Sequence, residues 1–189
     1  EVGTYGELPA ETEVREIDDA GGGVAVYAQP QPTLTLQPQF RDQDVYEVRV
    51  YDYRRNRQLV AAIEIVSPSN KDRPSHRSTF VAKVESLLRQ DICVSVVDFV
   101  STSGFNLYAE LLDSFGESDP ALGSPPPPMY ASTVRTRREG QHWVLDAWYH
   151  PLTIGQPLPT LPIWLNSRHG VSLNLESSYE ETCRTLRIA

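Results

Sequence analysis

The clearest apolar pattern in the chain runs from Val60 to Val66, where every residue except Glu64 is apolar. A continuous run of this length is typical of a strand that is covered on both faces. The preceding segment, residues 44–53, alternates between apolar and polar residues, and residues 54–57 predict a turn between the two. We therefore expect these two segments to form a β-hairpin.

The expected hairpin brings charged side chains onto one face. A two- or four-residue loop centred near Arg55 and Asn56 places Glu64 opposite Glu47, and a turn shifted by one residue places it opposite Arg49. In both registers Glu47, Arg49 and Glu64 share a face, because side chains alternate along a strand. A loop with an odd number of residues would separate them.

Farther along the chain, the spacing of apolar residues changes from that of a strand to that of a helix and then back to that of a strand. Phe80, Val84, Leu87 and Leu88 form the apolar stripe of a helix over about residues 75–89, and residues 92–100 form a second buried strand. The order strand, helix, strand predicts a right-handed crossover to a parallel neighbour. The other predicted elements are a strand at 33–36, a helix at 106–115, a hairpin of strands at 129–137 and 141–149, a proline-rich loop at 151–162, a strand at 163–165, and a helix at 175–187 with Leu175, Tyr179, Cys183 and Leu186 inward.

These elements predict an α+β fold, a mixed β-sheet with flanking helices. We expect residues 33–189 to form a single α+β domain and residues 1–32 to be a weakly structured or partial N-terminal segment. No apolar run reaches the roughly 18 residues of a membrane helix, so no membrane association is expected. Cys93 and Cys183 are expected to be lone thiols, which favours a reducing compartment, most simply the cytoplasm.

Charge limits the expected partners. The chain carries a formal net charge of −8, which argues against broad nonspecific binding of nucleic acid but leaves room for a local basic patch. Arg54 and Arg55 in the predicted turn, with Arg49 nearby, are candidates for contacts to nucleic-acid phosphates. The alternative is a solvated hairpin tip. The sequence does not indicate an oligomeric state.

Glu64 is the leading candidate for chemistry. An ionised carboxylate in a buried strand costs several kcal/mol, roughly, unless a cation, a metal or a proton compensates it. Glu47 and Glu64 could hold Mg²⁺ or Mn²⁺, and Lys71 or Lys83 could assist an attacking water. The alternative is a structural ion pair between Glu64 and Arg49.

The residues after the buried strands have two readings each. Asp98 at the end of the second strand could join the site or cap the next turn. Ser67, Ser69, Asn70 and His76 could form a polar loop beside the site, although turn and helix-capping roles explain them well. No Gly-x-Ser-x-Gly elbow surrounds Ser67, which argues against a serine hydrolase. The histidines and cysteines lack zinc-site spacing.

The segment Ile63-Glu64-Ile65-Val66-Ser67-Pro68-Ser69-Asn70-Lys71, with Lys83 in the next helix and Val96-Val97-Asp98 in the next strand, resembles an uncharacterised bacterial family of unknown function. The later segments 157–165 and 179–183 also look like that family, so the resemblance covers roughly residues 33–189. It implies a family but no activity.

The same segment is similar, more distantly, to the restriction-endonuclease-like PD-(D/E)XK superfamily. In that superfamily one strand supplies an acid, and the next supplies an acid, any residue, and a lysine. The resemblance implies a restriction-endonuclease-like core and metal-dependent cleavage of phosphodiesters. Val66 stands where the lysine belongs, so Lys71 or Lys83 would have to replace it. The competing expectation is a noncatalytic interaction or structural domain with a buried glutamate ion pair.

Overall fold

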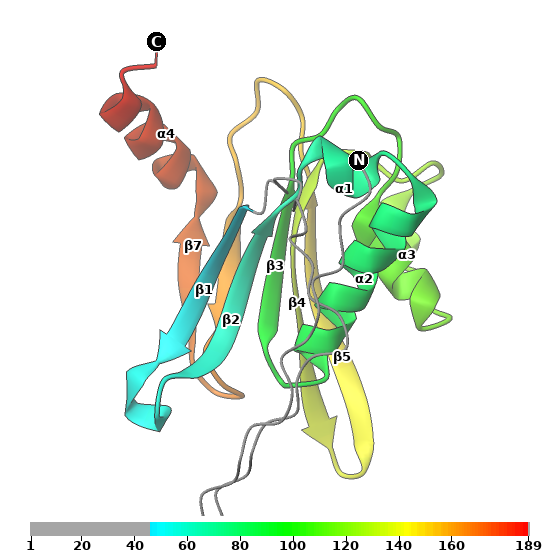
Figure 1. Cartoon of the computed structure of the whole chain (residues 1–189), viewed down its shortest axis with the longest axis vertical. Coiled ribbons are helices and arrows are strands. Elements are labelled where there is room, and N and C mark those ends of the chain that lie inside the picture. The colour runs from blue at the N-terminus through cyan, green and yellow to red at the C-terminus, as the bar shows by residue number, and fades with distance from the viewer. Residues whose placement is uncertain (1–45, 189) are drawn as a thin grey trace, which may run out of the picture. The chain divides into compact units, whose positions relative to one another are not determined.

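A five-stranded mixed sheet forms the centre of the computed structural model, which describes residues 46–188. Its strands lie side by side in chain order (Figure 1): β1 (Tyr46–Asp52), β2 (Gln58–Ile65), β3 (Cys93–Asp98), β4 (Tyr130–Glu139) and β5 (His142–Pro151). Strands β2 and β3 are parallel and the other neighbours are antiparallel. The α+β class and the parallel crossover are thus confirmed. The N-terminal segment 1–32 and the strand expected at 33–36 lie outside the described residues.

Helices cover one face of the sheet. Helix α2 (Pro74–Leu88) follows the short helix α1 (Pro68–Lys71), and α3 (Leu107–Ser114) packs beside α2. The predicted stripe of α2 is buried at Phe80, Val84 and Leu88, and it packs against Val94 and Val96 of β3. Arg77 of α2 joins the helices, because its Nε lies 2.7 Å from Glu110 Oε1 in α3. The remaining short helices are η1 (Tyr53–Arg55) and η2 (Pro120–Leu122).

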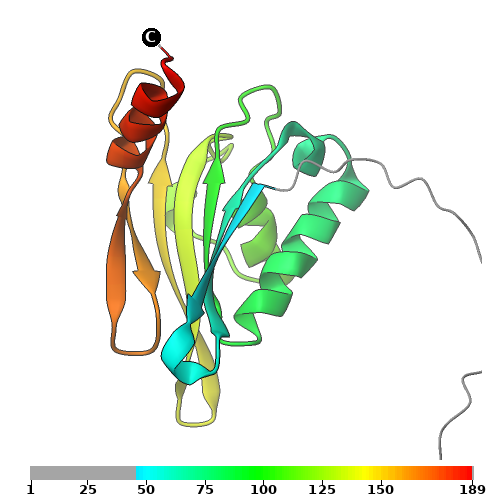
Figure 2. The ribbon, with the colours of Figure 1, turned by 60° about the vertical axis from the view of Figure 1, so that its left-hand side comes forward.

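A two-stranded hairpin covers the opposite face of the sheet, as the turned view in Figure 2 shows. It consists of β6 (Thr160–Trp164) and β7 (Gly170–Asn174). Leu161 and Ile163 of β6 pack against small side chains of the sheet, including Ala61 and Ala131. Strand β7 and the start of β6 were not predicted. Three of the five β7 side chains are polar or absent, so the apolar alternation is weak.

The last helix, α4 (Leu175–Leu186), has the predicted position, but only part of its predicted stripe is buried: Leu175 packs against the cluster of Leu161, and Cys183 is half-buried. Tyr179 is 58% exposed and Leu186 is 63% exposed, whereas we expected both to face inward. The face of the sheet nearest to α4 is already covered by β6 and β7. An amphipathic period shows which side chains share a stripe, but it does not supply a partner surface for that stripe.

The described residues also bear on two expectations about the environment of the chain. No helix among them is long and apolar enough to cross a membrane. Cys93 and Cys183 are free thiols, as expected, and Cys93 is buried between the sheet and β6.

Candidate functional site

The β1–β2 hairpin sets the geometry of the main cluster. Glu47 pairs directly with Glu64 across the two strands, in the first of the two predicted registers. The register shifts by one residue between Val50 and Tyr51, next to the turn and beyond the glutamates. Glu47 and Glu64 therefore share one sheet face, the face that helix α2 covers. The loop between the paired residues Asp52 and Gln58 has five residues, and an odd loop was expected to separate the glutamates. The extra residue Val60 at the register shift restores their shared face, which the strand period alone did not predict.

Helix α2 contributes the cation that joins the two carboxylates. The Nζ atom of Lys83 lies 2.5 Å from Glu47 Oε2 and donates a hydrogen bond of 2.8 Å to Glu64 Oε2. It also lies 2.7 Å from Glu64 Oε1, but the angle there does not suit a hydrogen bond. Glu64 Oε1 is therefore buried without a hydrogen bond from the described residues. Arg49 donates to Glu47 from the same strand.

The three charged side chains of this cluster differ in how deeply they are buried. The Glu64 side chain is 5% exposed, that of Glu47 is 9% exposed, and that of Lys83 is 35% exposed. Burial raises the pKa of Glu64 above its usual value, although Lys83 opposes the shift. The hydrogen bond from Arg49 lowers the pKa of Glu47 to about 2. Burial works against the charge on Lys83, but the two carboxylates outweigh it and its pKa is raised.

The expected ion pair of Glu64 thus exists with a different partner. We expected Arg49 to be the structural partner of Glu64, but Arg49 binds Glu47 and Lys83 binds both glutamates. Arg49 is exposed on the edge strand, and its guanidinium therefore binds Glu47, the nearer of the two carboxylates.

A second ion pair holds the other lysine of the chain. Lys71 Nζ donates 3.0 Å to Asp98 Oδ2, 2.9 Å to the carbonyl of Pro128 and 3.4 Å to the carbonyl of Val100. The side chains of Lys71 and Asp98 are both 0% exposed. Lys71 and Asp98 are therefore buried together, and neither makes a hydrogen bond or ion pair with Glu47 or Glu64. Helix α1 turns Lys71 into the core, where three acceptors use its three protons.

Asp98 also caps the end of β3, which was the alternative expectation. Its Oδ1 accepts 3.0 Å from the backbone amide of Val100. Burial raises the pKa of Asp98, and the hydrogen bond from Lys71 opposes this shift. Asp98 is thus a structural carboxylate with partners on both oxygens.

No family model, curated protein or solved structure matches the chain. The resemblance to PD-(D/E)XK nucleases therefore stays a hypothesis that rests on the residues themselves.

The polar loop after β2 stabilises α1 and does not reach the glutamates. The amide of Ser67 donates 2.8 Å to Asn70 Oδ1, and the Ser67 hydroxyl lies 2.7 Å from that of Ser69. His76 Nδ1 lies 2.9 Å from the carbonyl of Ser69 and 2.7 Å from Asp72 Oδ1. These contacts are those of a helix start, so the capping reading fits the loop.

The arginines of the β1–β2 turn are divided between two roles. Arg54 is exposed in η1, as a solvated hairpin tip would be. Arg55 Nε lies 3.6 Å from Asp52, and Arg55 also lines a cavity with Arg135 and Arg137 of β4. Sequence reasoning missed this cavity. The only signal was the arginine-rich end of β4, residues 135–138, which we treated as an ordinary hairpin.

The donors available for a metal are few. The described residues contain no group of three or more histidine, cysteine, aspartate or glutamate side chains that could hold an ion. Glu47 and Glu64 alone fit Mg²⁺ or Mn²⁺ with water and substrate phosphate completing the shell, as is common for Mg²⁺. Glu64 Oε1 makes no hydrogen bond with the described residues, and an ion that displaced the Lys83 ammonium, 2.7 Å away, could use this oxygen.

Proposed function

We propose that Glu47, Glu64 and Lys83 form the centre of a nuclease-like phosphodiesterase that uses Mg²⁺ or Mn²⁺. The observation that supports this proposal is the meeting of two carboxylates from paired strands with an ammonium from the covering helix, within 2.8 Å of Nζ. Two acids and a lysine on one face are the groups that the PD-(D/E)XK resemblance implies. Of the two candidate lysines, only Lys83 contacts the acids.

Each residue has a separate task in this proposal. A bound divalent ion would supply Lewis-acid polarisation of the phosphodiester and of an attacking water. Glu47, with a pKa of about 2, provides a carboxylate that stays ionised at neutral pH. Glu64 provides the second carboxylate, and a bound cation would oppose the burial that raises its pKa, because a positive charge lowers a carboxyl pKa. Lys83 is 35% exposed and can donate to phosphate oxygens as negative charge develops there.

A noncatalytic interaction or structural domain is the second candidate. It is favoured by the fact that the two glutamates already have cationic partners, Lys83 and Arg49. In this reading the cluster ties α2 to the edge hairpin and has no substrate. The free thiols favour a reducing compartment such as the cytoplasm for either function.

The deciding experiment incubates the protein with single- and double-stranded DNA and RNA, with and without Mn²⁺. The phosphodiesterase proposal expects cleavage that stops on chelation, in Glu64→Ala and in Lys83→Ala. The control variant Glu117→Ala changes an exposed glutamate and should keep full activity. Circular dichroism checks that each variant is folded. Absence of cleavage by the wild-type protein on all four substrates would reject the proposal.

A second readout does not depend on activity. If Glu64 is structural, Glu64→Gln should lower the free energy of unfolding by ~1–3 kcal/mol, because a hydrogen bond from a charged partner is weakened. If Glu64 serves a metal, Gln should be neutral or stabilising, because functional residues often cost stability. Mn²⁺ binding without nucleic acid, on the order of millimolar, should be lost in the same variant.

A further inference from the structure

A basic cavity lies at the end of the molecule where β2 and β3 begin. Its volume is about 830 Å³, which is within the range typical of small-molecule sites. It is lined by the β1–β2 turn, the starts of β2 and β3, the end of β4, and the turn between β6 and β7. Glu47, Glu64 and Lys83 are not part of this lining. The cavity is thus separate from the proposed metal centre.

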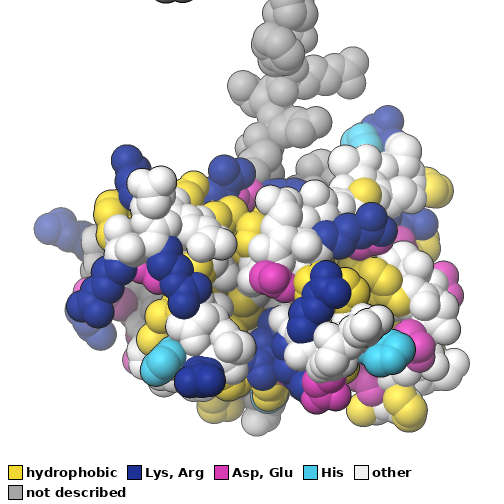
Figure 3. All heavy atoms as spheres, turned by 90° about the horizontal axis from the view of Figure 1, so that it is seen from below, with side chains coloured by type: hydrophobic (Ala, Val, Ile, Leu, Met, Phe, Trp, Pro, Cys, Tyr) yellow, Lys and Arg dark blue, Asp and Glu magenta, His cyan; other side chains and the backbone are white. Residues whose placement is uncertain are grey.

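The charge of the lining is opposite to that of the chain. The charged residues around the cavity are five arginines and one aspartate: Arg55, Arg135, Arg137, Arg138, Arg168 and Asp91. They give the lining a formal charge of +4, whereas the whole chain has −8. Figure 3 looks at this end of the molecule, and basic side chains are spread across it. Carboxylates outside the lining pair with three of these arginines: Asp52 with Arg55, and Asp146 with Arg135 and Arg137. Arg138 and Arg168 make no ion pair with the described residues, so they supply most of the positive charge that is left for a ligand.

Arg135 is held rigidly in the wall of the cavity. Its guanidinium lies 3.7 Å from the ring centre of Trp164 and 5.6 Å from that of Trp148. Asp146, which is not part of the lining, accepts 3.0 Å from Arg135 Nε and 2.9 Å from Arg137 Nε. The carboxylate therefore orients both arginines from outside the cavity. Rotamer entropy is already lost at these positions, but Asp146 already offsets part of the charge of both arginines, and Arg137 also pairs with Glu139.

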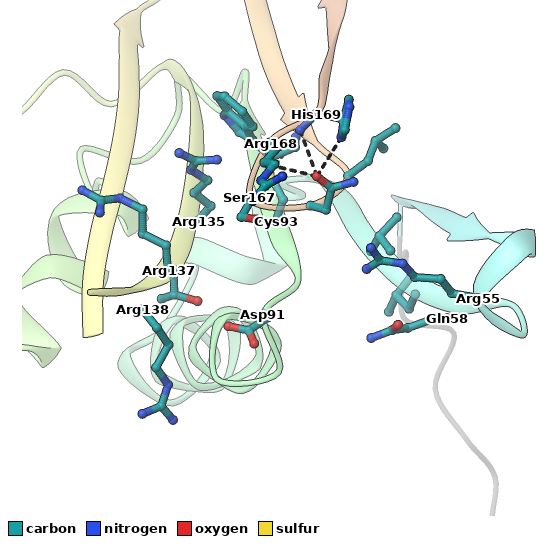
Figure 4. Close-up of a pocket in the computed structure, with 16 residues that line it drawn as sticks. Arg55, Gln58, Asp91, Cys93, Arg135, Arg137, Arg138, Ser167, Arg168 and His169 are labelled. Carbon is teal, nitrogen blue, oxygen red and sulfur yellow. Dashed lines mark hydrogen bonds between the residues drawn. The ribbon is translucent and has the colours of Figure 1, made fainter. Parts of the chain in front are cut away.

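Several donors in the wall remain without a partner. Arg135 Nη1 and Trp164 Nε1 make no hydrogen bond with the described residues, but both atoms are fully buried, so a ligand reaches them only if the neighbouring side chains move. Arg168 makes no ion pair with the described residues, and its turn is fixed because the amides of Arg168 and His169 both donate 2.9 Å to Asn166 Oδ1. Figure 4 shows Arg135 and Arg137 on one side of the cavity and Arg55 on the other. An acceptor-rich ligand would satisfy donors from three separate segments.

We propose that this cavity binds a small polyphosphate, such as the phosphate chain of a nucleotide. Arginine forks match the oxygens of phosphate groups in pairs, which makes arginine the usual residue for such recognition. The chain uses arginine at every basic position of the cavity. A linked row of phosphates has acceptor oxygens along its length, so it could engage guanidinium groups on both sides of the cavity (Figure 4).

The test measures binding of inorganic tripolyphosphate by calorimetry, without divalent metal so that the glutamate cluster is not recruited. Arg168→Glu and Arg55→Gln should each weaken binding about tenfold, the loss expected for one charged hydrogen bond. Arg187→Glu changes an exposed arginine after α4, at the other end of the structure in Figure 1, and should bind like wild type. Glu64→Ala should also bind like wild type, which separates this proposal from the proposed phosphodiesterase.

Four outcomes would overturn the proposal. They are no binding of tripolyphosphate at millimolar concentration, equal binding of citrate, an equal loss in Arg187→Glu and Arg168→Glu, and binding of long single-stranded DNA without any binding of tripolyphosphate. The last result would point to a nucleic-acid surface instead of a small-molecule site. A fall in affinity at higher salt is expected for charged groups that are partly exposed.

Discussion

Replacing Lys71 by methionine tests the buried ion pair most directly. Methionine fills a similar volume but removes the ammonium that binds Asp98, Val100 and Pro128. Asp98 then keeps only the amide of Val100, and two backbone carbonyls lose a donor. The pair is fully buried, so solvent cannot replace these contacts without local opening.

The expected loss in the free energy of unfolding is ~3–5 kcal/mol, the usual cost of removing one partner from a buried pair. Asp98→Asn should lower the free energy of unfolding by ~2–4 kcal/mol. The loss is smaller than in Lys71→Met, because two backbone carbonyls still accept hydrogen bonds from the charged Lys71. The double variant should cost about as much as Lys71→Met alone, which leaves a coupling energy of ~2–4 kcal/mol. Arg73→Met, at an exposed cation beside α1, should cost less than ~1 kcal/mol.

The assay is urea unfolding at neutral pH, followed by tryptophan fluorescence, for all four variants. In Lys71→Met the pKa of Asp98 should rise further, because the lowering effect of Lys71 is lost and only the amide of Val100 still opposes burial. A carboxyl with a raised folded pKa loses stability as pH increases, so this variant should partly recover at acidic pH. Costs in the two single variants that add to the cost in the double variant would refute the coupling. A cost below ~1 kcal/mol in Lys71→Met would refute the whole account.

Three further predictions follow from the other ionisable groups. Lys83→Met should leave Glu47 and Glu64 without their shared cation and lower the free energy of unfolding by ~1–3 kcal/mol. Urea titrations should show a larger loss at pH 8 than at pH 5, because a carboxyl with a raised pKa in the folded state, such as Glu64, loses stability as pH increases. The ionised Glu47 stabilises the wild type, and this contribution is lost as pH falls from 4.5 to about 2; Glu47→Gln should lack it at every pH. Thermal melts in which both proteins lose the same stability over this pH range would contradict the prediction. One thiol per native chain should react quickly with a thiol reagent, and none in Cys183→Ser, because burial raises the pKa of Cys93 to about 11.

The sequence predicted that Glu47 and Glu64 share a face, but not how the hairpin achieves it. The loop has an odd number of residues, and the bulge at Val60, which no local pattern predicted, brings the two glutamates back into register. Lys83 was one of the two lysines expected to act with the glutamates, and it reaches both carboxylates. The family resemblance and the phosphodiesterase activity stay predictions.

The contacts that the sequence did not predict depend on distant backbone. Lys71 followed a strand in a polar segment, and its burial requires the carbonyl of Pro128, which is 57 residues away. The basic cavity forms only where the β1–β2 turn and the β6–β7 turn meet the end of β4 and the starts of β2 and β3. Helix α4 shows the opposite case. Its apolar residues repeat with the period of a helix, but the described residues offer no surface that covers the exposed part of this stripe. Local patterns do not carry such long-range partners.

The placement of both lysines has a consequence for folding order. Lys71 lies 27 residues before Asp98, and Lys83 lies 19 residues after Glu64, so both pairs close within the segment from β2 to β3. Short loops cost less entropy to close than long ones. The strand–helix–strand unit therefore carries a cation for each of its own buried carboxylates, although Lys71 also uses the carbonyl of Pro128 from outside the unit. An intermediate that contained this unit alone would bury both carboxylates with a cationic partner.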